Sequence, residues 1–181
     1  MNDPRHYFVI DTLRNGTPVT IRAIRPEDKT RLVSAFKKLD RESVYTRFFQ
    51  YVRELTDQDL KRATEIDFDR EVALVVTTNL GDEETIIGTG RYVVFEEADS
   101  GRNAEVAFIV EEDYQGLGVA SRIFRHLVQI GRQNNVSRFT ADVLSGNQAM
   151  LRVFAGSGLP MKQQRDGTVA HVTLSLNETG S

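Results

Sequence analysis

The chain has 181 residues and a formal net charge of −3, with 40% hydrophobic and 27% charged residues, as in soluble globular proteins with one core. The charge balance gives no basic surface for non-specific nucleic-acid binding, and the lack of cysteine excludes thiol catalysis, disulfides and thiolate zinc sites. The N-terminus carries no apolar secretory segment, and no run approaches about 18 apolar residues. We therefore expect a single cytoplasmic domain over residues 1–181, with no membrane or nucleic-acid partner.

The first third of the chain predicts a hairpin followed by helices. Two β-branched runs, 8–13 and 19–24, flank Asn15-Gly16, a dipeptide that accepts the positive φ angles of a tight turn. Pro26 and the acidic residues after it predict a helix start, because they suit the first turn of a helix and its dipole. Two further short helices are predicted over residues 43–49 and 56–66.

The middle of the chain changes to strands. Three β-rich segments with short polar turns between them predict an antiparallel meander over residues 71–78, 85–95 and 104–110. Gly88 and Gly90 fall inside the second segment. Since no third glycine and no helix follow them, they are typical of a bulge or of close strand packing rather than of a dinucleotide loop.

The last third begins with the most regular helix pattern in the chain. From Gly116 to about Asn134 the apolar residues recur with the helical period, which predicts an amphipathic helix with Arg122, Arg125, Gln129 and Arg132 on its polar face. A strand over 138–144, a short helix over 148–155 and a final strand over 169–176 are predicted to follow.

The junction between the strand at 104–110 and this helix carries a binding pattern. Gly116, Gly118 and Ala120 leave out the side chains that would keep a diphosphate away, and a helix N-terminus adds unpaired N–H groups and a positive dipole. The segment 115–120 therefore predicts a pyrophosphate site. Glycines at such a junction also occur simply because they permit a tight connection.

Two motifs resemble those of the GNAT N-acetyltransferase superfamily. Gln-x-x-Gly-x-Ala at 115–120 resembles its acyl-CoA-binding signature, and residues 147–159 resemble its second motif, an Asn that opens a short helix ending in Gly and a large apolar residue. Segments 20–28, 42–49 and 67–74 are similar to the GNAT domain of bacterial protein lysine acetyltransferases. The resemblance implies an α/β fold, with a mixed, mostly antiparallel sheet that acetyl-CoA splits and helices flanking it.

The resemblance also implies a reaction and the residues that carry it. That subgroup transfers acetyl from acetyl-CoA to lysines of metabolic enzymes such as acyl-CoA synthetases, with a strand glutamate, here Glu105, as general base. Asn147 would touch the pantetheine or the developing thiolate. Two further sets of cofactor-binding residues are implied. Phe108, Ile109 and Val110 would pair with the pantetheine through their backbone groups. The pyrophosphate would be held by the backbone amides of Gln115, Gly116, Leu117, Gly118, Val119 and Ala120, with Ser121 as a possible addition.

Chemistry independently requires a base. A lysine amine, with a reference pKa of about 10.4, is mostly protonated at neutral pH and must lose a proton before it attacks a thioester. Glu105 lies in an otherwise apolar strand, where a carboxylate is costly without a partner or a purpose. The alternative interpretation is a glutamate on the solvated face of an antiparallel strand.

The sequence departs from the superfamily pattern at three places. Phe154 stands where many members have a Tyr that can protonate the leaving thiolate, and phenylalanine has no proton to donate. Leu117 replaces an Arg often found in the glycine turn. Acidic residues 111–113 flank the proposed anion site and would repel a diphosphate unless they point away from it.

No pair of histidines and no carboxylate cluster has the spacing of metal ligands, so no metal is expected. Three functions remain open. The first is a protein lysine acetyltransferase. The second is an acetyltransferase for a small amine, and the third is a non-enzymatic acyl-CoA-sensing module, which Phe154 motivates.

Overall fold

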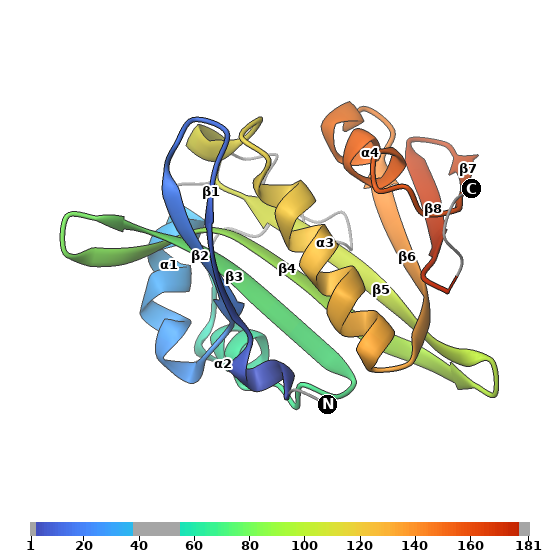
Figure 1. Cartoon of the computed structure of the whole chain (residues 1–181), viewed down its shortest axis with the longest axis horizontal. Coiled ribbons are helices and arrows are strands. Elements are labelled where there is room, and N and C mark those ends of the chain that lie inside the picture. The colour runs from blue at the N-terminus through green and yellow to red at the C-terminus, as the bar shows by residue number, and fades with distance from the viewer. Residues whose placement is uncertain (1–2, 38–54, 178–181) are drawn as a thin grey trace.

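The computed structural model describes residues 3–37 and 55–177, which form an eight-stranded sheet flanked by helices (Figure 1). The strands are β1 (Phe8–Thr12), β2 (Pro18–Ala23), β3 (Glu71–Leu80), β4 (Glu83–Ala98), β5 (Gly101–Val110), β6 (Val136–Leu144), β7 (Met161–Asp166) and β8 (Val169–Ser175). The helices are α1 (Lys29–Lys37), α2 (Asp57–Thr64), α3 (Val119–Gln133) and α4 (Gln148–Ala155), with 3-10 segments η1 (Pro4–His6), η2 (Pro26–Asp28) and η3 (Glu112–Tyr114). The helix predicted over 43–49 lies outside the described residues.

The sheet is mixed and mostly antiparallel, which confirms the predicted fold class. Its strand order is β1-β2-β3-β4-β5-β6-β8-β7, and β5–β6 is the one parallel neighbour pair among these strands. Parallel neighbours require a crossover connection, and α3 provides it. The predicted meander of β3, β4 and β5 is confirmed.

The turn and cap signals at the start of the chain form the predicted structures. β1 and β2 pair as an antiparallel hairpin, and Gly16 has a φ of +88° in the connecting turn. At the start of α2 the Thr56 hydroxyl accepts the Asp59 N–H at 3.1 Å, while the Asp59 carboxylate accepts the Thr56 N–H at 3.0 Å. This reciprocal capping box satisfies two N–H groups that would otherwise lack acceptors.

Neighbouring residues on β4 show that α3 and α2 cover opposite faces of the sheet (Figure 1). A Cβ atom added to Gly90 would overlap Ile123 of α3, and one added to Gly88 would lie 2.7 Å from Val119. Arg91 points the other way, since its guanidinium donates to the Ala63 carbonyl of α2 at 3.3 Å. The two glycines therefore let α3 pack directly on β4, as one of the two sequence interpretations proposed.

A buried ion pair fixes the start of α1 to the sheet. Asp28 is 0% and Arg22 4% exposed, and two guanidinium nitrogens of Arg22 lie 2.7 and 2.8 Å from the Asp28 carboxylate oxygens. Arg22 also bonds to Glu84 of β4. Burial opposes ionisation of Asp28, but hydrogen bonds from Arg22 and the Arg25 N–H, with the Arg22 and Arg31 charges, hold its pKa below the ordinary value.

Two elements differ from the sequence prediction. The helix α3 begins at Val119 rather than at Gly116, because Gly116 and Gly118 have left-handed φ angles of +81° and +89° that an α-helix does not accept. Strand β7 was not predicted. Only Met161 of β7 is partly buried and its other residues are exposed, so no apolar alternation marks it.

No helix in the described ranges is both long enough and apolar enough to cross a membrane. The single-domain interpretation for residues 1–181 stays a prediction.

Candidate functional site

The sheet splits between β5 and β6. The parallel pairing runs from Arg102↔Val136 to Glu105↔Thr140 and then stops, whereas β5 continues to pair with β4 as far as Val110. Within the described residues no strand pairs with the β6-side edge of β5 beyond Glu105. The N–H and C=O groups of that edge are therefore available to a strand-like ligand.

The glycine-rich turn lies just beyond this open edge. Gln115 donates through its side-chain amide to the Val110 carbonyl at 3.3 Å, which holds the turn against the end of β5. Gly118 precedes the first residue of α3, and no side chain caps this helix. The first N–H groups of an uncapped helix lack intrahelical acceptors, so α3 presents free donors and the positive end of its dipole at the turn.

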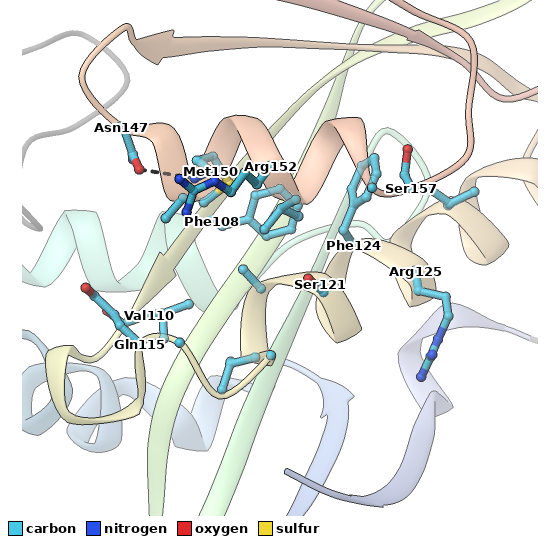
Figure 2. A pocket seen from close by; sticks show the side chains of 18 of the residues that line it. Phe108, Val110, Gln115, Ser121, Phe124, Arg125, Asn147, Met150, Arg152 and Ser157 are labelled. Atoms are coloured by element: carbon cyan, nitrogen blue, oxygen red, sulfur yellow. Dashed lines mark hydrogen bonds between the residues drawn. The ribbon is translucent and has the colours of Figure 1, made fainter. Parts of the chain in front are cut away.

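A cleft of about 1890 Å³ connects the split to the turn. β5, the turn, α3, α4 and the loops around α4 form its walls, and Figure 2 shows lining side chains from these elements. Ten residues expected from the sequence to bind the cofactor line this cleft: Phe108, Ile109, Val110, Gln115, Gly116, Gly118, Val119, Ala120, Ser121 and Asn147. The arrangement suits an extended ligand with an anionic group at the turn.

Comparison with known proteins identifies this arrangement. The model of the family described as "Acetyltransferase (GNAT) family" matches residues 36–158. The chain belongs to the GNAT acetyltransferase family.

Three relatives show where in this family the chain lies. A solved structure of the GNAT domain of S. lividans PAT has a TM-score of 0.82 and 33% identity, over 93% of this chain and 96% of that one. Acetyltransferase Pat of Mycolicibacterium smegmatis is 31% identical over 157 residues, which are 87% of this chain but 46% of Pat. Acetyltransferase PA5475 of Pseudomonas aeruginosa is 28% identical over 141 residues, 78% of this chain and 74% of that protein.

Glu105 lies at the apex of the split. It is the last β5 residue that pairs with β6 and is partly buried, whereas its neighbours Ala104 and Val106 are buried in the core. Alternate strand residues share a face, so Glu105 lies on the same face as Ala107, whose partner on β4 is Arg91. Glu105 is thus on the α2 face, opposite α3, and is not among the residues that line the cleft.

Asn147 caps the helix of the second GNAT motif. Its side-chain oxygen accepts the Met150 N–H at 3.2 Å (Figure 2), and it lines the cleft. Because an amide side chain has two N–H donors besides that oxygen, the Asn147 amide nitrogen can donate to a ligand while the cap is kept.

The side chains of Leu117 and Phe154 pack on or in the core and do not line the cleft. Leu117 is expected to contact the pyrophosphate through its backbone amide, which stays a prediction, while its side chain packs against the hydrophobic core and does not line the cleft. Its side chain supplies no cation to the turn. The Phe154 ring is 1% exposed, and its centroid lies 5.2 Å from that of Phe124 and 6.0 Å from that of Phe108. It joins α4 to α3 and β5.

Several cleft residues were not predicted as site residues. Arg125, Gln129 and Arg132 of α3 were interpreted only as a polar helix face, yet they form one side of the cleft. Their spacing of four and three residues was the available signal, because it aligns them along one helix face that leads away from the turn. Arg14 and Arg152 also line the cleft, but no sequence pattern connects them to it.

Charges around the turn are partly compensated. Asp11 of β1 pairs with Arg122 at 3.1 Å and with Arg125 at 3.8 Å. A hydrogen bond from the Thr12 N–H, together with these arginines, lowers the pKa of Asp11.

Two of the acidic residues near the turn differ in exposure, since Glu111 is buried and Asp113 is exposed. Burial of Tyr114, together with the negative charges of Glu111 and Asp113, raises the pKa of its hydroxyl. The Tyr114 hydroxyl therefore stays protonated in the wall of the cleft.

The histidines do not form a metal site. His126 is buried on α3, where its ring bonds to the Tyr7 hydroxyl, and burial with the nearby Arg125 charge lowers its pKa. His171 of β8 lies 2.5 Å from the Asp142 carboxylate of β6 at the surface. Among the residues that the structure describes, no cluster of three or more potential ligands can hold a metal ion.

Proposed function

We propose that the chain binds acetyl-CoA in this cleft and transfers its acetyl group to a lysine amine of a protein. The pantetheine lies along the open edge of β5 at Phe108–Val110, and the pyrophosphate lies against the amides of the turn. Support comes from the unpaired β5 edge, the uncapped start of α3 and membership of the GNAT family. The acetyl-CoA-bound fold neighbour from Salmonella typhimurium, at 17% identity, supports the fold alone.

The position of Glu105 at the apex of the split carries the catalytic part of the proposal. A ligand that enters from the α3 side ends near this apex, and Glu105 stands there on the opposite face. Adjacent strand residues point to opposite faces of the sheet, and the adjacent β5 residues Phe108 and Ile109 both line the cleft. The cleft is therefore accessible from both faces of the sheet at β5. An acceptor amine can therefore approach the acetyl carbon from the side of Glu105.

The reaction then runs by direct attack. Glu105 removes one proton from the lysine ammonium, directly or through a water. The free amine nitrogen attacks the acetyl carbonyl carbon, the C–N bond forms, and the C–S bond breaks with its electron pair leaving on the CoA sulfur. The attacking nitrogen gives up its second proton to water, so the products are acetyl-lysine and the CoA thiolate.

Asn147 and water complete the leaving-group step. Phe154 has no proton to donate and is buried, so water protonates the thiolate. The amide nitrogen of Asn147 donates a hydrogen bond to the pantetheine or to the developing thiolate, since its oxygen is held by the α4 cap. A donor placed where charge develops stabilises the transition state.

A lysine of a metabolic enzyme, such as an acyl-CoA synthetase, is the proposed acceptor. The similarity to the S. lividans PAT domain and to Pat supports a protein substrate, although the chain spans less than half of Pat. Cytoplasmic location stays a prediction.

The test is an acceptor panel with acetyl-CoA, in which lysine peptides, intact acyl-CoA synthetases and small amines are compared and products are identified by mass spectrometry. We expect acetyl-lysine on the protein acceptor. Acetylation of small amines alone would replace the acceptor by a small molecule. Binding of acetyl-CoA with no transfer to any acceptor would indicate a sensing module, and a failure to bind any CoA ester would refute the whole proposal.

A further inference from the structure

Two arginines, Arg122 and Arg14, contact the glycine turn from different parts of the chain. The Arg122 guanidinium uses its N–H donors within the protein. Arg122 of α3 donates to the Asp11 carboxylate at 3.1 Å and to the Thr12 carbonyl at 2.9 Å. It also donates to the carbonyls of Leu117 and Gly118 at 3.4 and 3.2 Å. With these partners Arg122 acts as a structural link between β1 and the start of α3.

Arg14 is the second arginine and lies at the tip of the β1–β2 hairpin. Its backbone N–H donates to the Leu117 carbonyl at 3.4 Å, and its guanidinium donates to the Gly116 carbonyl at 3.3 Å, across 102 positions of sequence. It is exposed and lines the cleft. No ion pair between Arg14 and a carboxylate occurs in the described part of the chain, and the Arg14 side chain lines the cleft, where its charge and its remaining N–H donors are accessible to a ligand.

Gly118 brings both guanidinium groups close to the turn. A Cβ atom at this position would overlap the Arg122 guanidinium and would lie 3.4 Å from the Nε of Arg14. The absence of a side chain at Gly118 thus lets Arg14 lie near the first amides of α3. Leu117 has an apolar side chain and brings no cation to the turn, whereas Arg14 brings one from outside the motif.

We propose that Arg14 is a further acetyl-CoA-binding residue that contacts the pyrophosphate, an inference that rests on the proposed function. A planar guanidinium matches the paired oxygens of a phosphate, and its charge adds to the positive end of the α3 dipole. The first hairpin then forms one wall of the diphosphate site, together with the glycine turn.

The experiment titrates CoA and 3′-dephospho-CoA into the wild-type protein, Arg14→Gln, Arg14→Lys and the control Arg165→Gln by calorimetry. Arg165 is an exposed arginine on β7 outside the cleft. Loss of one charge-assisted contact raises the dissociation constant by about tenfold. We expect this increase for both ligands with Arg14→Gln, a smaller one with Arg14→Lys, and none with Arg165→Gln. The increase shrinks with added salt, because salt screens exposed charges.

Three results would overturn the inference. Unchanged affinity of Arg14→Gln would remove Arg14 from the site. A loss seen with CoA but not with 3′-dephospho-CoA would assign Arg14 to the 3′-phosphate instead. A loss that is independent of salt would mean that Arg14 only braces the turn. A wild-type protein that binds neither ligand would refute the proposed function itself, and that result is distinct from the other three.

Discussion

Replacement of Gly90 by alanine tests the packing that positions α3 and the cleft. The added Cβ would overlap Ile123 and lie 2.9 Å from Cδ1 of Phe108, and Ile123 is 0% exposed. Overpacking of this kind costs about 1–3 kcal/mol, because buried side chains must leave their rotamers or the helix must move. In a chain of this length, each kcal/mol lost from the free energy of unfolding lowers the thermal unfolding midpoint by about 2–4 °C.

Urea unfolding followed by far-UV circular dichroism measures this loss, since the chain has no tryptophan for fluorescence. Gly146→Ala is the matched control, because a Cβ there meets no atom within 4 Å. We expect that control to stay within about 0.5 kcal/mol of the wild type. If Gly90→Ala is as stable as Gly146→Ala, β4 and α3 do not pack as closely as described.

Three further changes test the buried charges and the second motif. Asp28→Asn removes the carboxylate that both guanidinium nitrogens of Arg22 contact and leaves this buried cation only Glu84 as an anionic partner among the described residues, so the free energy of unfolding at pH 7 should fall by about 3 kcal/mol. Since the folded pKa of Asp28 is lowered, wild-type stability should fall as the pH drops below about 4. Asp28→Asn should lack this part of the fall, and an equal fall in the variant would contradict the ion pair. The lowered pKa of His126 predicts that the thermal unfolding midpoint falls as the pH drops below about 6.5, because protonation of the buried ring is unfavourable. The midpoint of His126→Gln should fall less over the same pH range. An equal fall in both proteins would exclude His126 as a cause of the pH dependence. Asn147→Ala removes the α4 cap and should cost about 1 kcal/mol in urea unfolding, with weaker acetyl-CoA binding by calorimetry; an unchanged affinity would restrict Asn147 to capping.

The local features of the fold were predictable from sequence. Asn15-Gly16 specifies the first hairpin, Thr56 with Asp59 specifies the start of α2, and the period of the apolar residues specifies α3. Each of these signals lies within one continuous segment, so it can be recognised without knowledge of contacts to distant residues. Strand β7 has no such signal, because its side chains are almost all exposed and its pairing with β8 alone defines it.

The site was only partly predictable, because its geometry depends on contacts between distant segments. The glycine turn and Asn147 follow from short motifs, and both lie on the cleft. The split after Glu105 depends on where β6 leaves β5, which no local pattern specifies. The backbone role predicted for Leu117 stays a prediction, but the packing of its side chain on the core, between two glycines with left-handed φ angles, could not be predicted from the motif.

The most direct test of the central claim compares Glu105→Gln with the wild type, using the acceptor identified by the panel and calorimetry with acetyl-CoA. A general base contributes about 10²- to 10⁴-fold to the rate. We predict that turnover falls by that factor while the acetyl-CoA dissociation constant stays nearly unchanged, and that the exposed control Glu83→Gln alters neither. Wild-type turnover in Glu105→Gln would contradict the assignment of Glu105 as the base.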